Sequence, residues 1–502
     1  MVKVINVLEK ANEDGEALTF NDIRLKTGYS DILPVDVNLE SKFSRNVPLK
    51  IPIVSAPMDT VTEYELAREL AILGGLGILH RNLSPEDQQF HVHKVKYHLH
   101  GFIREPVCVK GDRTIQSILL EKEKQKYGFD SFPVLDSNGR LVGLLTGNDF
   151  MFCDDLSSAA GEIMTKEVIT ARTETNIEEA YRIMKEKKKK VLPLIDDDRK
   201  VTGLYTFKDL KRIISGESNM YNTDVRGQLR VGAAIGVGND AFNRLELLVK
   251  ANVDVVVIDT SHGDTKSVID TLIEIKSKYP DLDVVVGNIS EADSAMRLIK
   301  AGADGLRVGQ GGGSICTTRV VTGTGCPQVT AIYNCVKPAE EAEIPVCADG
   351  GLQYSGDIAV AIGVGAHSVM MGNMLAGTRE SPGEEIFDEG KTWKEYRGMG
   401  SEEAMLTGEG SRERYLQGGD VRGKFVPEGV SGRVELKGSL KQVIHQYVGG
   451  LRHSMGLQGA RNINELREKA DFWRITHSGD IESHPHNVRI TRDPPNYQPL
   501  QK

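Results

Sequence analysis

The chain lacks the cysteine patterns of metal centres and disulfide frameworks. Its 6 cysteines contain no CxxC pair and no zinc-ligand spacing, and a chain of 502 residues does not need disulfides to stabilise its core. The sequence also has no run near the roughly 18–20 apolar residues of a membrane span, and its first residues lack the apolar segment of a signal peptide. We therefore expect a cytoplasmic protein without a membrane partner.

The sequence has no excess of basic residues either. Its net charge is -9, whereas a generic binder of phosphate backbones carries a basic excess or a basic face. The one basic run, residues 185–190, continues a helical pattern and is interpreted as a solvent-exposed face. Nucleic acid is therefore not an expected partner.

A glycine-rich stretch, residues 309–319, is the most unusual feature that the sequence does contain. It carries Cys316 and follows a short apolar segment typical of a strand. Its glycines cost backbone entropy, which is tolerated where φ is positive or where a ligand approaches the main chain. This stretch alone is compatible with an ordinary surface loop or with a reactive thiol near Arg307 or Arg319. The cysteines predicted instead to be small buried hydrophobic residues are Cys326, Cys335 and Cys347.

Short apolar segments recur along the chain and alternate with helical periodicity. Eight such segments predict an α/β fold, the (β/α)8 TIM barrel, in which function collects on the loops after the strands. A length of 502 residues exceeds the ~250–300 residues at which single cores stop growing, so a further domain is expected. The predicted strands are residues 51–54, 76–79, 230–234, 253–259, 282–287, 305–308, 344–348 and 368–371.

An internal repeat interrupts this rhythm after the second predicted strand. Residues 132–149 match residues 192–209 at a constant offset of 60, including the apolar pairs, a proline, a glycine and a Thr-x-x-Asp motif. Two copies of one strand-turn-strand-helix unit are predicted, each too small to bury its own faces, so they should pack together. The repeat resembles a tandem pair of cystathionine-β-synthase (CBS) modules, which sense adenine nucleotides. The resemblance makes Thr146, Asp149, Thr206 and Asp209 candidates for nucleotide contacts, although these positions also suit simple strand-helix turns.

Six polar clusters come directly after predicted strands. Any one of them suits a capping or turn device, but six on the rim of one barrel favour a ligand site. Glycine N–H groups in residues 350–351 and 372–373 can approach phosphate oxygens closely, and Ser314 offers a hydroxyl. The clusters are residues 55–58, 259–263, 287–288, 309–319, 349–351 and 372–373.

Six sequence motifs resemble, in order, those of the inosine-5′-monophosphate (IMP) dehydrogenase family. The resemblance covers essentially the whole chain. It implies a catalytic barrel in residues 1–103 and 216–502, a tandem CBS regulatory domain in residues 104–215, a mobile flap at about 400–432 and a cation-binding C-terminal tail. A glycine-rich and charged composition with little periodicity also favours a mobile loop for the flap. The motifs are residues 55–62, 313–319, 348–351, 396–401, 414–415 and 482–486.

The resemblance implies oxidation of IMP to xanthosine 5′-monophosphate in guanine nucleotide biosynthesis, with NAD as hydride acceptor. Cys316 would attack C2 of the hypoxanthine ring, and the covalent intermediate would then be hydrolysed. In the family a flap brings an Arg-Tyr pair to activate water, here Arg414 and Tyr415, while Thr318 and Glu428 match a second proton relay. Because the pKa of arginine exceeds ~12, Arg414 must act neutral in a shielded site or polarise water while another group takes the proton.

Binding residues follow from the same resemblance, position by position. The nicotinamide side would meet Asp259, Thr260 and Ser261. Carbonyls of Gly311, Gly313 and Cys316 would hold K+, with Glu482, Ser483 and His484 supplied by a neighbouring subunit of a homotetramer or octamer. An adenine or guanine nucleotide would bind the CBS pair. The substrate-binding residues would be Met58, Asn288, Arg307, Ser314, Asp349, Gly351, Gly372, Asn373, Tyr396, Gly398, Met399, Gly400 and Glu428.

Two positions depart from the family pattern. Gly312 stands where Pro or Ser is usual, which would loosen the cysteine loop, and Asn373 stands where Ser is usual. Two alternatives also remain. An NADPH-dependent GMP reductase shares the barrel, cysteine and phosphate loops, but lacks the Arg-Tyr flap and usually the CBS pair. A nucleotide sensor with reduced catalysis would not need Cys316, Arg414 and Tyr415, so these residues argue for the oxidation of IMP.

Overall fold

The computed structural model describes residues 7–98, 102–103, 106–124, 127, 129–415, 425–491 and 494–497. Contacts divide the chain into two compact units, residues 1–98 with 220–502, and residues 99–219. The first unit is therefore assembled from two separate stretches of sequence, and the second is inserted between them in the chain.

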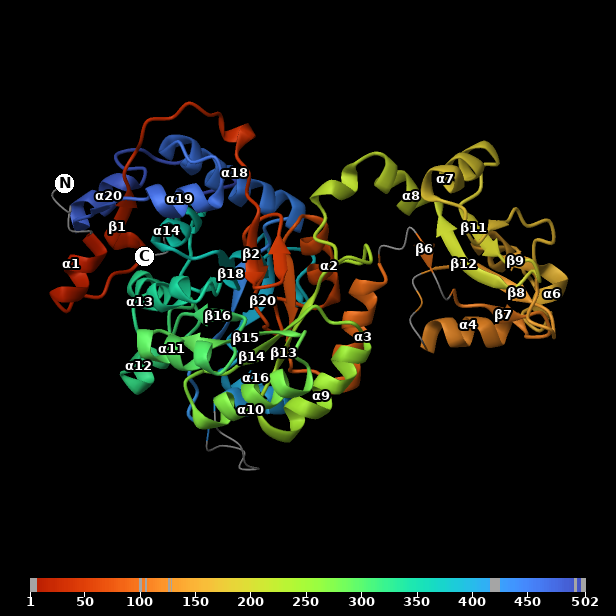
Figure 1. Cartoon of the computed structure of the whole chain (residues 1–502), viewed down its shortest axis with the longest axis horizontal. Coiled ribbons are helices and arrows are strands. Elements are labelled where there is room, and N and C mark those ends of the chain that lie inside the picture. Colours follow the sequence, from red (N-terminus) through yellow and green to blue (C-terminus); the bar gives the residue numbers. More distant parts are fainter. Residues whose placement is uncertain are drawn as a thin grey trace. The chain divides into compact units, whose positions relative to one another are not determined.

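Eight strands of the described first unit close into a barrel in the order β13 (Gly232–Ile235), β14 (Val255–Asp259), β15 (Asp283–Ile289), β16 (Gly305–Val308), β17 (Val346–Asp349), β18 (Ser368–Met371), β4 (Ile53–Ser55) and β5 (Leu76–Leu79) (Figure 1). Neighbouring strands are parallel around the whole circuit. Each strand begins and ends within two residues of its predicted segment, so the predicted barrel is confirmed. The strands are almost entirely apolar because both of their faces are buried.

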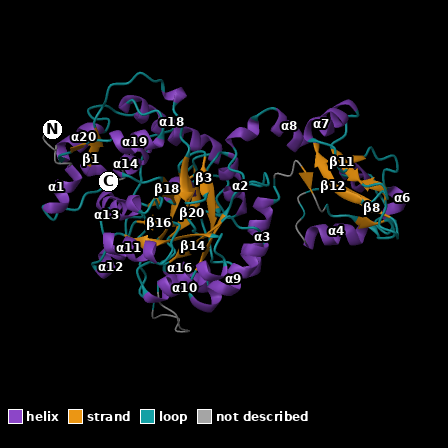
Figure 2. Ribbon diagram, viewed as in Figure 1, coloured by secondary structure: helices purple, strands orange, loops and turns teal. Residues whose placement is uncertain are grey.

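Helices surround these strands, and each covering helix follows one barrel strand in the chain (Figure 2). Their apolar residues lie on the face that packs inward: α11 buries Ala295 and Leu298 but exposes Met296. Within the described residues no helix is both long and apolar enough to cross a bilayer. The covering helices are α2 (Tyr64–Ile72), α3 (Pro85–Lys96), α9 (Gly238–Lys250), α10 (Lys266–Lys278), α11 (Ala292–Lys300), α13 (Gln328–Glu341), α14 (Ser355–Val364) and α18 (Leu440–Gln458).

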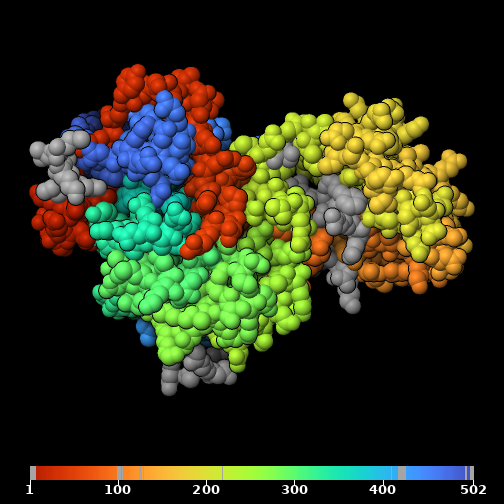
Figure 3. Space-filling view, in the orientation of Figure 1, coloured from red at the N-terminus to blue at the C-terminus, as the bar shows by residue number. Residues whose placement is uncertain are grey.

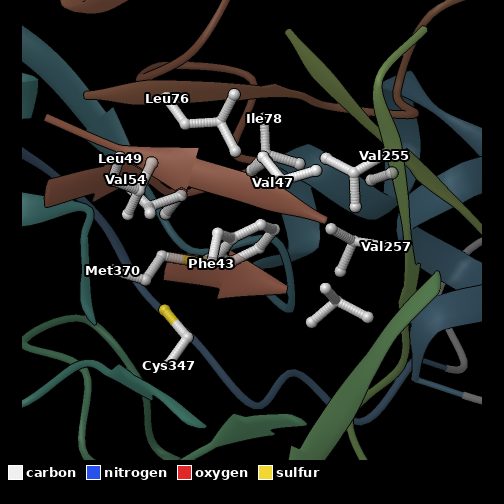
Figure 4. Close-up of a cluster of buried hydrophobic side chains, with 13 residues drawn as sticks. Phe43, Val47, Leu49, Val54, Leu76, Ile78, Val255, Val257, Cys347 and Met370 are labelled. Atoms are coloured by element: carbon white, nitrogen blue, oxygen red, sulfur yellow. The ribbon is translucent and has the colours of Figure 1, made fainter. Parts of the chain in front are cut away.

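A short hairpin closes the amino-terminal end of the barrel. Its strands β2 (Ser41–Ser44) and β3 (Val47–Leu49) pair antiparallel, and Phe43 points into the barrel among the apolar side chains of the strands (Figure 4). Ser44 Oγ donates a 2.5 Å hydrogen bond to Asp283 Oδ2, which ties the hairpin to the start of β15. Because this end is filled by side chains, the carboxyl ends of the strands are left to form a site.

The two ends of the described chain lie together on the barrel unit, where blue C-terminal residues border red N-terminal ones (Figure 3). Arg452 of α18 donates to the carbonyls of Val35, at 3.1 Å, and Val37, at 2.7 Å. Residues near both ends therefore pack against the same outer surface. The elements here are α1 (Val7–Glu13), η1 (Phe20–Asp22), β1 (Ile23–Leu25), which pairs with β22 (Phe472–Arg474), η2 (Pro34–Asp36), α19 (Ile463–Lys469) and α20 (His477–Ser483).

Further elements extend from the carboxyl ends of the barrel strands. A three-stranded antiparallel sheet flanks the segment predicted to be the flap. Its second strand ends just before that segment, and its third strand begins in the last residues of the segment. Its strands are β19 (Glu385–Asp388), β20 (Lys391–Arg397) and β21 (Ser431–Glu435), and the short helices are α12 (Thr318–Thr322), α15 (Asn373–Ala376), α16 (Glu402–Thr407) and α17 (Glu409–Arg414).

The inserted unit is built from two similar halves, as the sequence repeat predicts. Phe132 pairs with Leu145 in the first half, and Leu192 pairs with Tyr205 in the second, so the register repeats at the same offset of 60 residues as the sequence. The halves touch through a 2.8 Å hydrogen bond from Leu141 N to Arg199 O. The first half comprises β7 (Val109–Lys110), α4 (Ile115–Lys124), β8 (Phe132–Leu135), β9 (Leu141–Leu145), α5 (Gly147–Met151) and α6 (Ala160–Ile163); the second comprises β10 (Ala171–Arg172), α7 (Ile177–Glu186), β11 (Val191–Ile195), β12 (Val201–Thr206), to which β6 (Phe102–Ile103) adds, and α8 (Phe207–Ile214), before η3 (Glu217–Met220) leads out.

Candidate active site

A cavity of about 600 Å³ lies at the carboxyl ends of the barrel strands. The loop that carries Cys316 forms one wall of it, and loops after β4, β15, β17 and β18 form others. Among the predicted site residues, those that line the cavity are Met58, Ser261, Asn288, Arg307, Gly311, Gly313, Ser314, Cys316, Thr318, Asp349, Gly351, Gly372, Asn373, Tyr396, Gly398, Met399, Arg414, Tyr415 and Glu428. Residues assigned to this rim from separate sequence motifs are thus brought together by the barrel.

A buried ion cluster forms part of the cavity wall and extends behind it. Arg307 of β16 pairs with Asp259 at the end of β14 and with Asp349 at the end of β17, the latter at 2.9 Å. Burial alone would lower the pKa of Arg307, but the two carboxylates raise it above its usual value. Asn288 Nδ2 donates to Asp349 Oδ2 at 2.7 Å, while its buried Oδ1 has no partner within the protein. A buried amide oxygen without a partner on the cavity wall fits a bound ligand with a donor.

Arg414 joins the same cluster from the flap segment. Its guanidinium is hydrogen-bonded to Asp259, and its carbonyl accepts from Ser261 N at 3.1 Å. Burial would raise the pKa of Asp259, but the positive charges of Arg414, Arg307 and Arg81 lower it. Asp259 is therefore a fixed anion that holds the flap arginine at the cavity.

The Cys316 loop is held from both sides by main-chain hydrogen bonds. Cys316 N donates to Gly313 O at 3.0 Å, and Thr317 N donates to Glu428 O at 2.9 Å. The Cys316 thiol donates to Thr318 Oγ1 at 3.2 Å. Cys316, Thr318 and Glu428 are consequently neighbours although Glu428 is distant in sequence.

The arginines expected beside the thiol have other partners. Arg307 is engaged by Asp259 and Asp349, and Arg319 donates to main-chain carbonyls of Gln310 and Cys326. Arg319 therefore shapes the glycine-rich loop. The other three predicted hydrophobic cysteines are buried, and burial raises the pKa of Cys326 to about 11 and that of Cys347 to about 12.

Glycines line the part of the cavity predicted to bind phosphate. Gly350 and Gly351 have φ of +87° and +79°, a region that L side chains rarely adopt. A Cβ on Gly372 would lie 3.0 Å from Met58 Sδ and 3.1 Å from Tyr396 Oη. Tyr396 is buried and hydrogen-bonded to the Ser314 side chain; burial raises the pKa of its phenol, which stays a donor at neutral pH. This part of the wall therefore consists of glycine main chain and the protonated phenol of Tyr396.

The flap segment contains regular structure, whereas the composition favoured a loop. The helices α16 and α17 form between residues 402 and 414, and the Ser401 hydroxyl caps the first by accepting from Ala404 N at 3.3 Å. The Tyr415 ring packs on Gly400, where a Cβ would lie 2.6 Å from Tyr415 Cζ. Burial raises the pKa of Tyr415 to about 12, so its hydroxyl stays protonated at neutral pH. Residues 416–424 of the predicted flap lie outside the described residues.

Other predicted residues do not line the cavity. Asp259 and Thr260 are buried behind it, with Thr260 Oγ1 donating to Gly287 O at 3.0 Å, and Gly400 lies under Tyr415. The tail residues Glu482, Ser483 and His484 lie elsewhere on the same chain; His484 Nδ1 is 3.2 Å from Tyr497 Oη. Within the described ranges no group of three or more His, Cys, Asp or Glu side chains is arranged to hold a metal ion.

Sequence reasoning missed residues that support the site from behind. Gln328, at the start of α13, donates from Nε2 to Val308 O at 2.8 Å and so anchors the beginning of the cysteine loop. Arg81 bonds to Glu413 in α17 at 2.7 Å. No local pattern identifies either residue, because each partner is distant in sequence.

Comparisons with known proteins agree with this geometry. A family model described as IMP dehydrogenase / GMP reductase domain matches residues 17–486. The chain belongs to this family. It is 47% identical over 487 residues to inosine-5'-monophosphate dehydrogenase of Aquifex aeolicus (strain VF5), covering 96% of this chain and 98% of that protein. It is 44% identical over 485 residues to inosine-5'-monophosphate dehydrogenase of Bacillus subtilis (strain 168), with the same coverage.

A solved structure in this family concerns the reductase. A cysteine-to-alanine variant of GMP reductase from Trypanosoma brucei, in complex with guanosine 5'-monophosphate, is 36% identical with a TM-score of 0.87, and the match covers 95% of this chain and 100% of that one. A match of this extent spans most of the inserted unit. The insertion by itself therefore does not separate a dehydrogenase from a reductase, and the distinction drawn from the sequence rests on Arg414 and Tyr415.

The first prediction concerns the departure at Gly312. A Cβ at Gly312 would be at least 3.4 Å from its neighbours, whereas Gly311 has φ of +74° and a Cβ there would lie 2.5 Å from Arg319 Cγ. We expect Gly312→Ala to keep activity within about twofold and to raise the free energy of unfolding by about 0.4–1 kcal/mol, because it reduces the freedom of the unfolded chain.

The matched control is Gly311→Ala in the same loop, which we expect to lower both activity and stability. Steady-state kinetics and denaturant unfolding of both variants measure the difference. Equal losses in the two variants would contradict the assignment of a spacious position at Gly312.

Proposed function

We propose that the chain oxidises IMP to xanthosine 5′-monophosphate with NAD, as a step of guanine nucleotide biosynthesis. The observation that carries this proposal is the single cavity lined by Cys316, Thr318, Arg414, Tyr415 and Glu428. The proposed nucleophile Cys316 therefore shares one cavity with two proposed water-activating pairs, Arg414–Tyr415 and Thr318–Glu428. Near-complete coverage of relatives named inosine-5'-monophosphate dehydrogenase supports the same reaction.

The first half-reaction is an attack on C2 of the hypoxanthine ring. A Cys316 Sγ–C2 bond forms as the thiol proton is released to solvent, and the C2 hydrogen departs with its electron pair as hydride. NAD supplies the hydride acceptor when bound. Ser261, on the cavity wall, and Asp259 with Thr260 behind it are the residues proposed to shape the nicotinamide side. An open cavity of about 600 Å³ gives room for a nucleotide, which supports this assignment.

The second half-reaction is hydrolysis of the Cys316–C2 bond. Arg414 is paired with Asp259 and is therefore charged in this arrangement. A charged guanidinium does not accept a proton, so Arg414 polarises the attacking water together with the Tyr415 hydroxyl. The Thr318–Glu428 pair takes the proton, and the thiol regains one as the product leaves.

Substrate binding is proposed to use main-chain N–H groups and side-chain hydroxyls on the cavity wall. The phosphate is held by N–H groups of Gly351, Gly372 and Asn373 and by the hydroxyls of Ser314 and Tyr396. The Asp349 carboxylate accepts from the ribose hydroxyls. The other predicted contacts to the nucleotide are Met58, Asn288, Arg307, Gly398, Met399, Gly400 and Glu428, and Asn373 retains the donor that the usual serine would supply.

A potassium ion is proposed at the carbonyls of Gly311, Gly313 and Cys316. Carbonyl oxygens suit a hard cation, and the positive φ of Gly311 turns the loop where such ligands are needed. Glu482, Ser483 and His484 do not line their own chain's cavity, which supports their donation to a neighbouring subunit in a homotetramer or octamer. Replacing potassium by sodium in the activity assay tests the cation, and light scattering tests the assembly.

A regulatory nucleotide, adenine or guanine, is proposed for the CBS pair. Thr146 and Thr206 both bond to the aspartate three residues later, at 2.7 and 2.5 Å. These bonds close the start of α5 and α8, so in this arrangement the four side chains act as helix caps. The symmetric halves support a nucleotide between equivalent turns, and calorimetric titration of the full chain with ATP and GTP tests it.

The second prediction concerns the nucleophile. Cys316→Ala should lower IMP- and NAD-dependent NADH formation at least ~1,000-fold, because the covalent step is lost. Absorbance of NADH measures it, with Cys153→Ala, a half-exposed cysteine of the inserted unit, as the control expected to stay active. Deamination of GMP with NADPH in place of IMP oxidation would refute the proposed function.

The third prediction concerns Arg414. Arg414→Ala should slow hydrolysis roughly 100–1,000-fold, because general acid–base and water-orienting groups contribute on that order, while hydride transfer changes little. Single-turnover kinetics separate the NADH burst from the slower steady state. Equal slowing of both steps would remove Arg414 from the role of a hydrolysis group.

A further inference from the structure

Arg81 is a buried arginine whose partner lies in the flap segment. It follows β5 by two residues, and its side chain is only 2% exposed. Its Nη1 donates to Glu413 Oε2 at 2.7 Å. Arg81 does not line the cavity, whereas the residue after Glu413 is Arg414, which does. The pair therefore connects a fixed point of the barrel to the residue beside a hydrolysis group.

Two glycines allow this approach. A Cβ on Gly236, just after β13, would lie 2.7 Å from Arg81 Nη1 and 3.3 Å from Glu413 Oε2. A Cβ on Gly410 of α17 would lie 2.7 Å from Arg81 O. The ion pair occupies space that a side chain at position 236 would fill, and α17 packs directly on the Arg81 main chain. The contact between Arg81 and α17 is thus closely packed, unlike an ion pair between two exposed side chains.

The charges around Arg81 explain why Glu413 is needed there. Arg81 and Arg414 both act on the buried Asp259, and both lower the pKa of that carboxyl. Together with Arg307, three guanidinium groups therefore act on one anion beneath the flap segment. Glu413 supplies a second anion from α17 itself, which offsets the repulsion between Arg81 and Arg414.

We propose that Arg81 and Glu413 are positioning residues that hold α17 in the docked arrangement, in which Arg414 and Tyr415 face Cys316. This inference rests on the proposed function, because it assigns the pair to the hydrolytic half-reaction. The docked segment and the nicotinamide share the Asp259–Ser261 side of the cavity, since Arg414 bonds to both of those residues. Loss of the pair therefore favours the undocked arrangement, in which NAD meets less competition.

The test uses Arg81→Met and Glu413→Gln in the full chain, each of which removes one charge with little change in length. We expect hydrolysis to slow about tenfold in both, hydride transfer to stay within about twofold, and inhibition by excess NAD to begin at a concentration several-fold lower. The last two readouts separate positioning from a general loss of folded protein. Arg81→Lys should recover part of the hydrolysis rate, and the double variant should be no slower than the slower single variant, because one interaction is removed in each case.

The control is Arg461→Met, which breaks the exposed pair of Arg461 with Asp31 and should change neither rate. Glu413 is about two-fifths exposed, so Glu413→Gln keeps the test decisive even where Arg81→Met fails to fold. Unchanged hydrolysis in Glu413→Gln, or equal slowing of both half-reactions, overturns the positioning role of the Arg81–Glu413 pair. Absence of IMP oxidation in the unsubstituted chain instead overturns the proposed function, so the two failures are distinguishable.

Discussion

The buried pairing of Arg307 with Asp259 and Asp349 is the interaction on which the site depends. Each residue lies on a different barrel strand, and Arg307 is 2% exposed. An isolated buried charge costs several kcal/mol, so each of the three requires the others. Closure of the barrel brings them together, and the cluster in turn fixes the position of Asn288 and the attachment point of Arg414. The same ion cluster therefore contributes both to the stability of the barrel and to the geometry of the site.

The filled end of the barrel and the open end have complementary roles. The β2–β3 hairpin places Phe43 in the barrel interior, where it packs against the apolar side chains of the strands at the amino-terminal end (Figure 4). At the other end, glycines replace side chains where Gly350, Gly351 and Gly372 face the cavity. Among the described residues, apolar side chains thus fill one end of the barrel, while glycine main chain lines the cavity at the other end.

The flap segment and the proposed nicotinamide side share one residue, Asp259. Asp259 belongs to the proposed nicotinamide side, yet it is bonded to Arg414 when α17 is docked. The same carboxylate cannot offer the same surface to both at once. Under the proposed function, cofactor and flap segment would therefore alternate at this anion, and the strength of docking would set the balance between hydride transfer and hydrolysis.

The sequence by itself determined the barrel strands and predicted the chemistry of the loops that follow them. Strand positions followed from apolar periodicity, and the repeat at an offset of 60 indicated the two halves of the inserted unit. The motif around Cys316 predicted a reactive loop. These signals are local, because they depend on residues within one segment. Motif resemblance then extended them to the roles of Thr318, Arg414 and Glu428.

Only the tertiary structure decided which charges meet. Arg81 and Glu413 are separated by 332 positions, and Arg307 reaches Asp259 across 48. No periodicity links such pairs, because their proximity arises only when eight strands close into a barrel. The helices of the flap were also hidden, since a segment rich in glycine and charge forms α16 and α17 through caps and contacts with the Arg81 main chain that composition does not reveal. Local sequence pattern thus predicted the individual strands and helices of the barrel, whereas closure of the barrel brought together the ion pairs that form the site.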